Sequence, residues 1–271
     1  MLIRRAEPVT YKKSLFTPLH GLTGLSWKVQ AGGRRFVARR QPASSAFIPG
    51  INRQREYRLL RKLAHRKITA YPLGFQYPWL LLNWAQGEEP DAAQWQAQSA
   101  ALIQLLTRLH TQPPVGYRLN ILALLWRYWQ LTDPCWRHPR WLRILRRLSH
   151  QKEPIPLRLA PLHLDIHREN SLLTPGGLVL IDWEYAADGD VGLELCMLRY
   201  SGVITSYDWP AWQHDYAQAM SLDGRRLEQQ IARWRPWVNL LRASWYSLYA
   251  QQRGGDNQLL SLAQTAWQQA K

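Results

Sequence analysis

The stretch from Pro161 to Tyr185, PLHLDIHRENSLLTPGGLVLIDWEY, constrains the fold more than any other part of this sequence. It contains two apolar runs of strand length, Ser171–Leu173 and Leu178–Ile181. Between them lies Thr-Pro-Gly-Gly, in which proline presets φ at the second position of a turn and glycine accepts a positive φ at the third. This pattern predicts a β-hairpin, which brings the residues before its first strand close to those after its second.

Polar side chains flank the predicted hairpin at the end opposite its turn. Asp165 and Asn170 precede the first strand and Asp182 follows the second, so all three should lie at one rim of a small sheet. The oxygens of Asn170 and Asp182 suit Mg²⁺, a hard cation that also takes substrate phosphates. Asp165 can then accept the proton of an attacking hydroxyl group. The arrangement indicates phosphoryl transfer.

Two histidines in the same stretch leave a second interpretation open. His163 and His167, with Asp165 between them, could hold Zn²⁺ or iron and activate water for hydrolysis. The segment follows Pro161 and leads into a strand rather than a helix, and His214 is the only later histidine that could complete such a site. We favour histidines that support the loop.

The order of patterns along the chain predicts two lobes. With 271 residues, of which 46% are hydrophobic, the chain is long enough for two lobes that share a cleft. Alternating runs such as Trp27–Gln30 and Arg35–Arg39 indicate strands in the first part. Apolar residues at helical spacing dominate the second part, apart from the hairpin. We expect an N-lobe over residues 1–85 and a C-lobe over residues 86–271.

Helices are expected in the second lobe at several positions. The apolar spacing predicts them at roughly 98–110, 121–131, 191–202, 209–220, 226–253 with a break near Pro236, and 257–270. A basic helix is also expected in the first lobe, around residues 52–66.

The charge of the chain bears on its partners. A formal charge of +16 admits nucleic acid, an anionic membrane surface or a small polyanion such as a nucleotide. Much of the excess lies in residues 52–67, from Arg53 onward, and 136–148, where basic residues surround an apolar stripe. This spacing is typical of the solvated face of an amphipathic helix, so we favour it over a nucleic-acid surface.

The sequence predicts a protein of the cytoplasm without membrane contact. Its two cysteines are too few for a disulfide framework. No apolar run reaches the roughly 20 residues that cross a bilayer. The beginning, MLIRRAEPVTYKK, lacks the apolar core of a secretion signal.

The residues now support a family resemblance. HLDIHREN at 163–170, followed by LIDWEY at 180–185, resembles the signature of the aminoglycoside phosphotransferase and choline kinase family. The wider runs 161–170 and 178–194 are most similar to the bacterial members that phosphorylate thiamine. The resemblance implies an α+β, bilobal, protein-kinase-like fold with a small β-rich N-lobe and a larger, mainly helical C-lobe. It also implies ATP and Mg²⁺ as cofactors.

The resemblance assigns roles to single residues. It implies that Asp165 is the catalytic base and that Asn170 and Asp182 bind the metal. Glycines and hydroxyls in the loop 21–26 would cover the phosphates, and residues 83–87 would form the hinge beside adenine. The nucleotide-binding residues implied in this way are Gly21, Thr23, Gly24, Ser26, Arg39, Glu56, Leu82, Asn83 and Trp84.

One position departs from the family pattern. The family usually ends an N-lobe strand in a phosphate-binding lysine, whereas Val37-Ala38-Arg39 has an arginine there, with Glu56 as its expected partner. Arginine keeps the charge but differs from lysine in reach and geometry. The alternative of a catalytically weak module that binds RNA or another polyanion therefore stays open.

The acceptor is expected to be a small molecule. A chain of charge +16 is a poor host for polycationic aminoglycosides unless a local acidic patch exists; candidates for such a patch are Glu184, Asp188, Asp190 and Glu194. A monocation with aromatic rings and a primary alcohol, such as thiamine, fits better and could stack on tryptophan. Choline and amino sugars are the alternatives. The expected acceptor-binding residues are Trp126, Trp129, Trp183 and Glu184.

Overall fold

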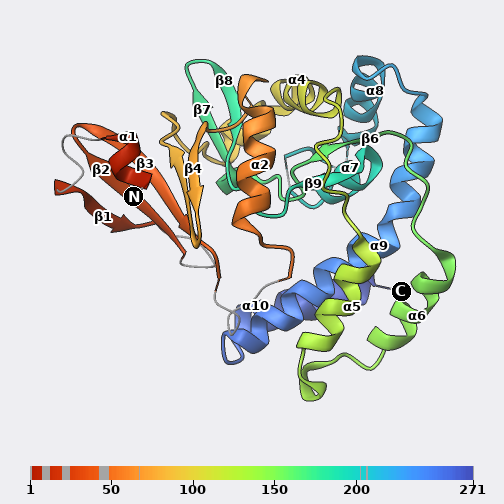
Figure 1. The fold of residues 1–271 in the computed structure, drawn as a ribbon. Coiled ribbons are helices and arrows are strands. Elements are labelled where there is room, and N and C mark those ends of the chain that lie inside the picture. Colours follow the sequence, from red (N-terminus) through yellow and green to blue (C-terminus); the bar gives the residue numbers. More distant parts are fainter. Residues whose placement is uncertain are drawn as a thin grey trace.

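The computed structural model describes residues 2–7, 13–19, 25–42, 49–66, 68–201, 203–205 and 207–270. A five-stranded antiparallel sheet lies at one end and helices fill the other (Figure 1). The first elements are α1 (Leu2–Ala6), β1 (Leu15–Pro18), β2 (Ser26–Ala31), β3 (Arg34–Arg40), α2 (Arg53–Leu63), a 3₁₀ turn (Ala64–Arg66), β4 (Pro72–Gln76) and β5 (Trp79–Asn83). The mixed α+β architecture predicted from the sequence is confirmed.

The sheet follows from short turns between alternating strands. Its order is β1-β2-β3-β5-β4. Gly32 and Gly33 both have positive φ, at 56° and 78°, which is the backbone that a two-residue hairpin turn requires. The predicted hairpin of residues 27–39 is therefore confirmed. Asn52 begins α2 by accepting the backbone N–H of Arg55, and α2 packs against β4 and β5.

The second part of the chain is helical around two short strand pairs. Its elements are α3 (Ala92–Ala97), α4 (Ser99–His110), α5 (Ile121–Leu131), a 3₁₀ turn (Pro134–Trp136), α6 (Trp141–Gln151), β6 (Leu159–Leu162), a 3₁₀ turn (Arg168–Asn170), β7 (Ser171–Thr174), β8 (Gly177–Leu180), β9 (Ala187–Asp190), α7 (Val191–Leu198), α8 (Trp209–Ala219), α9 (Gly224–Gln252) and α10 (Asn257–Gln269). The predicted hairpin is β7 and β8, paired from Ser171 with Leu180 to Thr174 with Gly177.

The hairpin joins the two parts of the molecule. The N–H of Leu180 donates to the carbonyl of Ile68 at 3.1 Å. Glu88 and Leu173 exchange two backbone hydrogen bonds of 3.1 and 2.8 Å. A Cβ on Gly87 would come within 2.7 Å of the Leu173 carbonyl oxygen, so this linker position needs glycine. Backbone contacts therefore hold the linker against the hairpin.

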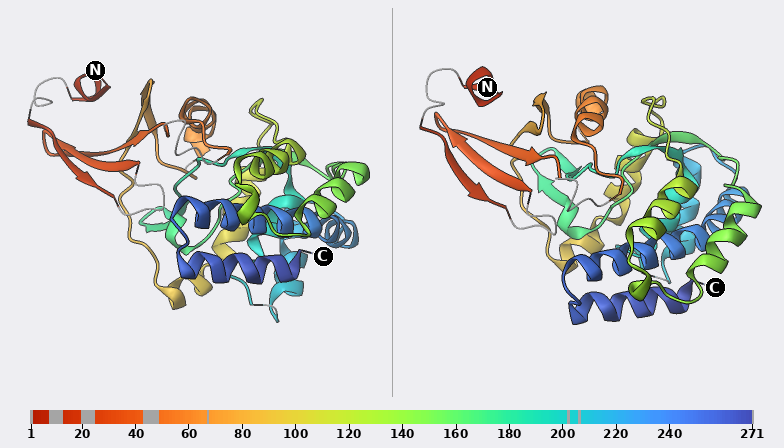
Figure 2. Two further views of the ribbon diagram at one scale, coloured as in Figure 1. Left: turned by 90° about the horizontal axis from the view of Figure 1, so that it is seen from below. Right: turned by 60° about the horizontal axis from the view of Figure 1, so that its bottom comes forward.

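The expected break near Pro236 is wrong. Helix α9 runs from Gly224 to Gln252 with Pro236 inside it, and it extends along the helical part in both views of Figure 2. Proline removes one backbone hydrogen bond and disfavours a helix interior. Trp234, Trp237 and Val238 are buried on either side of it, however, and their packing maintains the helix. Tertiary burial therefore outweighs the local preference.

Two further observations concern the cysteines and the length of the helices. Both cysteines, Cys135 and Cys196, are free thiols, as the sequence predicts. None of the helices formed by the described residues combines the length and apolar character that a membrane crossing needs.

Candidate active site

The loop between β6 and β7 is held by its own first histidine. His163 is fully buried, and its Nε2 lies 2.8 Å from the carbonyl oxygen of Ile181. Its Nδ1 accepts the backbone N–H of Asp165 at 3.2 Å. These two contacts correspond to a neutral ring protonated at Nε2. His163 thus connects the Asp165 loop with the segment that carries Asp182.

A buried carboxylate fixes the same loop from behind. Glu194, 1% exposed on α7, accepts the N–H groups of His163 at 2.6 Å and Leu164 at 2.8 Å. Leu164 has a positive φ of 67°, which is uncommon for a bulky residue. The two charge-assisted hydrogen bonds hold this strained backbone and set the direction of Asp165.

Asn170 faces Asp165 through its amide nitrogen. Nδ2 of Asn170 lies 2.8 Å from Oδ2 of Asp165 and 3.0 Å from its carbonyl oxygen. It also lies 2.9 Å from Nε2 of His167, whose Nδ1 contacts Glu169 at 2.8 Å. With the nitrogen engaged on this side, the amide oxygen of Asn170 is the atom directed elsewhere.

The charge of His167 is set by opposing neighbours. Burial lowers its pKa, but the carboxylates of Asp165 and Glu169 outweigh burial and raise the pKa to about 9. The amide nitrogen of Asn170 opposes the cation, because a protonated Nε2 would place two donors face to face. The two carboxylates nevertheless outweigh it, so the ring carries a positive charge at neutral pH, with Nε2 3.5 Å from Oδ2 of Asp165.

Asp182 is tied to the sheet by an arginine. It follows β8 with a positive φ of 62°. Its Oδ1 lies 2.5 Å from Nη2 of Arg39, which also contacts Glu184 at 2.8 Å, while Nη1 of Arg39 contacts Glu56 at 2.7 Å. Burial would raise the pKa of Asp182, but the positive charge of Arg39 lowers it overall. Asp182 is therefore an anion at neutral pH.

Burial and neighbouring charges also shift the pKa values of Arg39 and Glu184, the two neighbours of Asp182 in this cluster. Burial would lower the pKa of Arg39, yet the attraction of Asp182, Glu56 and Glu184 raises it. Burial and the neighbouring charge of Asp182 raise the pKa of Glu184 to about 7. Within the cluster, Arg39 is thus a permanent cation and Asp182 the carboxylate that it favours most.

These groups line one large cavity of about 1330 Å³. Its walls include most of the predicted site residues: Ser26, Arg39, Glu56, Leu82, Asn83, Trp84, Asp165, His167, Asn170, Asp182, Trp183 and Glu184. His163 stands behind the wall, with its ring edge-on to Trp183 at 4.7 Å between centroids. Gly21, Thr23 and Gly24 lie outside the described residues.

Two predicted acceptor residues lie elsewhere. Neither Trp126 nor Trp129 is among the described residues that line the cavity. Trp129 instead packs edge-on against Trp141 at 5.6 Å, with the guanidinium of Arg137 4.3 Å from its ring centroid. Trp126 is half-buried against the main core. Helical spacing identifies a buried face but does not say whether that face meets a cavity.

The candidate residues for an acidic patch do not form a free acidic surface, because their carboxylates are already hydrogen-bonded. Asp188 accepts the N–H groups of Val115, Gly116 and Tyr117 at 2.6–2.8 Å. Asp190 accepts the indole N–H of Trp234 at 2.6 Å, and its other oxygen accepts backbone N–H groups. Glu194 holds the Asp165 loop in the same way. These carboxylates hold loops in place by accepting their N–H groups. No pattern in the sequence indicates this role.

Arg53 is a buried residue next to the site that the sequence did not predict; Tyr128, Tyr185 and Tyr249, which line the cavity, are others. Arg53 was expected on a solvated helix face, but it is fully buried. Its Nη1 contacts Glu56 at 2.7 Å, and its Nε donates to the Arg40 carbonyl at 3.3 Å. The i, i+3 spacing of Arg53 and Glu56 in the first turn of α2 was the available signal.

The donor set near Asp165 is suited to magnesium. Asn170 and Asp182 offer a neutral and an anionic oxygen, and the Asp182 side chain is 36% exposed on the cavity. Mg²⁺ prefers few protein oxygens and keeps water or phosphate on its other positions. No cluster of three or more histidine, cysteine or acidic side chains with metal-binding geometry occurs among the described residues.

Comparison with known proteins decides the family. Residues 16–237 match the sequence profile of the phosphotransferase enzyme family. The chain belongs to the phosphotransferase enzyme family. Thiamine kinases of Escherichia coli O157:H7 and Shigella dysenteriae serotype 1 are each 38% identical to it over 254 residues, covering 92% of this chain and 87% of theirs. The resemblance seen in the sequence is thereby confirmed.

Solved structures agree on the fold of this phosphotransferase. A choline kinase from Streptococcus pneumoniae superposes with a TM-score of 0.71 at 16% identity, covering 94% of this chain and 92% of that one. A structure of LicA in complex with AMP gives a TM-score of 0.75 at 16% identity and covers 96% and 93%. The protein-kinase-like fold predicted from the motifs is confirmed.

The anchoring of the Asp165 loop can be tested in this phosphotransferase by Glu194→Gln. The variant keeps its size but turns one acceptor oxygen into an NH₂ group that must face a backbone N–H. We expect the free energy of unfolding to fall by about 2–3 kcal/mol in urea denaturation. Glu228→Gln, at an exposed position of α9, is the control and should change it by less than about 0.5 kcal/mol. Equal unfolding midpoints for the two variants would contradict this role.

Proposed function

We propose that this phosphotransferase transfers the γ-phosphoryl group of ATP to the hydroxyethyl oxygen of thiamine, giving thiamine phosphate and ADP. The observation that carries the proposal is 38% identity to thiamine kinases over 92% of the chain. The cavity supports it with one carboxylate, Asp165, beside two oxygen donors, Asn170 and Asp182.

Asp165 is the proposed catalytic base. Its carboxylate is oriented by the amide of Asn170 and by a backbone that Glu194 holds. Such a carboxylate can accept the proton of the thiamine hydroxyl and direct the oxygen toward phosphorus. Phosphoryl transfer needs little covalent chemistry from the protein, so positioning supplies most of the rate.

Asn170 and Asp182 are the proposed magnesium ligands. Bound there, the cation would neutralise the charge of the phosphates. The protein's contribution is to fix both ligands: the N–H of Ile181 donates to the Asn170 carbonyl at 2.9 Å, and Arg39 holds one oxygen of Asp182. The other oxygen of Asp182 is the one offered to the cation.

The first part of the chain is proposed to bind the nucleotide. Leu82, Asn83 and Trp84 line the cavity at the end of β5 and fit the adenine end. Nε of Arg39 is buried and has no hydrogen-bond partner among the described residues, so it can donate to a phosphate oxygen. We propose the boundary between nucleotide-binding and catalytic parts at residues 85–86.

The acceptor is proposed to lie against aromatic walls on the far side of Asp165. Tyr128, Tyr185, Trp245 and Tyr249 line this part of the cavity. Burial, with the nearby Glu184 charge, raises the pKa of Tyr128 and of Tyr185, so both rings stay neutral. Neutral aromatic faces suit a thiazolium cation.

A polycationic acceptor fits this pocket less well. Asp188, Asp190 and Glu194 are committed to backbone and indole N–H groups, and Glu184 is paired with Arg39. Of the other carboxylates that line the cavity, Glu89 and Glu169 are paired with Arg168, and Asp256 accepts backbone N–H groups at the start of α10. Few unpaired carboxylates therefore remain to balance several ammonium groups. The two free thiols are consistent with the cytoplasm, where we propose that the protein acts on thiamine.

A phosphorylation assay tests the proposal directly. With ATP and Mg²⁺, we expect ADP release with thiamine and little with choline, glucosamine or an aminoglycoside. Asp165→Asn should lower kcat by at least about 10²-fold and leave the unfolding temperature nearly unchanged, because it removes the general base. Robust turnover of another alcohol without turnover of thiamine would reject the acceptor, and an unchanged rate in Asp165→Asn would reject the base.

The aromatic wall has its own test in two matched tryptophans. Trp245 and Trp126 are both half-buried on helices, but only Trp245 lines the cavity. Trp245→Leu should raise the KM for thiamine about tenfold or more through lost stacking and leave the KM for ATP unchanged. Trp126→Leu should change neither constant. The reverse result would place the acceptor against α5 instead.

A further inference from the structure

Four buried side chains form a closed ring of alternating charge beside the metal ligands. Glu56 contacts Arg39 through Oε1 and Arg53 through Oε2, each at 2.7 Å. Oε2 of Glu184 lies 2.8 Å from Arg39 and 3.0 Å from Arg53, the latter an ion pair rather than an aligned hydrogen bond. The ring, which we call the Arg39 ring, joins β3, the start of α2 and the segment after β8.

Asp182 is attached to this ring at one atom. Nη2 of Arg39 contacts both Glu184 and Asp182, so the two carboxylates share one nitrogen. With all five groups ionised, the two arginines and three carboxylates sum to a net charge of −1. Without Arg53 the same buried site would carry −2, and a buried charge without a partner is costly. Arg53 and Glu184 therefore balance the charge while limiting how completely Arg39 neutralises Asp182.

We propose that Arg53 and Glu184 are positioning residues for phosphoryl transfer, which hold the Arg39 guanidinium shared between Glu56 and Asp182. The proposal rests on the proposed function, in which Asp182 binds the cation. It gives a reason for arginine at position 39: a guanidinium presents two Nη ends to two elements, whereas lysine presents a single nitrogen. Arg53 itself is fully buried and acts only through Glu56 and Glu184.

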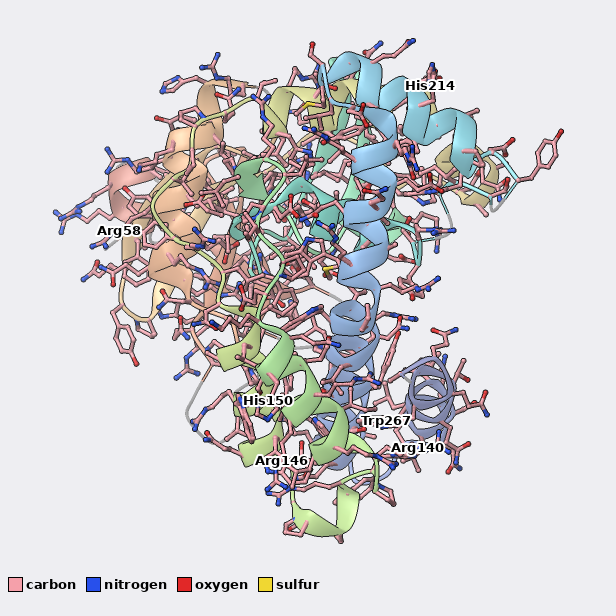
Figure 3. All side chains as sticks on the ribbon, turned by 90° about the vertical axis from the view of Figure 1, so that its right-hand side faces the viewer. Arg58, Arg140, Arg146, His150, His214 and Trp267 are labelled. Carbon is pink, nitrogen blue, oxygen red and sulfur yellow. The ribbon has the colours of Figure 1, made fainter. Side chains whose placement is uncertain are left out.

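A second arginine on the same helix, Arg58, lies outside the Arg39 ring. Arg58 lies on α2, is exposed, and points away from the molecule in Figure 3. Its hydrogen bond to the hydroxyl of Tyr117 is long, at 3.4 Å. Arg58→Met thus removes one arginine from the same helix without changing the Arg39 ring, and it serves as the matched control.

The test separates positioning from stability with paired substitutions. Arg53→Met alone leaves unbalanced buried carboxylates and should lower the urea midpoint sharply. Arg53→Met combined with Glu184→Gln removes the second pair together and should restore most of that midpoint. If Arg53 and Glu184 only stabilised the fold, the double variant would also bind Mg²⁺ as tightly as the wild type. We expect instead that the double variant binds Mg²⁺ about 10–100-fold more weakly than the wild type.

The readout is magnesium binding, without turnover. The full-length protein is saturated with a non-hydrolysable ATP analogue and titrated with Mg²⁺ while tryptophan fluorescence is recorded, since Trp84 and Trp183 line the cavity. Arg58→Met should match the wild type. Wild-type magnesium affinity in a double variant of restored stability would overturn the proposal.

A further variant decides the matter if the double variant does not recover stability. Arg53→Lys keeps the charge but not the planar fork. It should remain folded and bind Mg²⁺ more weakly by about tenfold; wild-type affinity in this variant would also overturn the proposal.

Failure of the proposed function gives a different result. Wild-type protein that binds the analogue with Mg²⁺ but does not phosphorylate thiamine would reject the acceptor and leave the comparison of variants valid. Wild-type binding of the analogue that is independent of Mg²⁺ would reject the metal site and this proposal together.

Discussion

The interaction on which the site depends is the contact of Arg39 with carboxylates from two other parts of the chain. Arg39 lies on a sheet strand, Glu56 on the helix that packs against the sheet, and Asp182 after the hairpin. Burying these charges is costly unless each one is paired and hydrogen-bonded. Pairing therefore requires β3, α2 and the catalytic part to lie together, and the cavity forms where they meet. Under the proposed function, the same contact couples nucleotide binding and metal binding through one side chain.

Two buried acidic groups outside the cavity lining bind backbone rather than ligands. Asp188 in β9 accepts three main-chain N–H groups and Glu194 in α7 accepts two, and each residue is 1% exposed. Carboxylates bound in this way define loop shape more strictly than neutral acceptors do. Their charge is used internally, which leaves the acceptor side mainly aromatic and neutral. A single-charge aromatic alcohol fits that environment better than a polycation.

The sequence predicted those features that depend on local pattern or on a short motif. The hairpin and the meeting of Asp165 with Asn170 follow from spacing, and the structure contains them, although the positive φ of the turn falls at Gly177 and not at the expected Gly176. The burial of Arg53 was not predicted, because helical periodicity alone places arginines on the exposed face of a helix. Likewise, Trp126 and Trp245 are both half-buried tryptophans on helices, and only the packing of distant helices decides which one meets the cavity. The predicted helix break near Pro236 was wrong for a related reason, because burial of the neighbouring side chains outweighs the tendency of proline to end a helix.

The most direct measurement is a crystal structure with Mn²⁺, a non-hydrolysable ATP analogue and thiamine. Our account predicts an anomalous manganese peak coordinated by the Asn170 amide oxygen and by Asp182, with Arg39 still on the other oxygen of Asp182. It also predicts the thiamine hydroxyl within hydrogen-bond distance of Asp165, about 2.6–3.2 Å. A metal bound away from Asn170 and Asp182, or a hydroxyl directed away from Asp165, would contradict it.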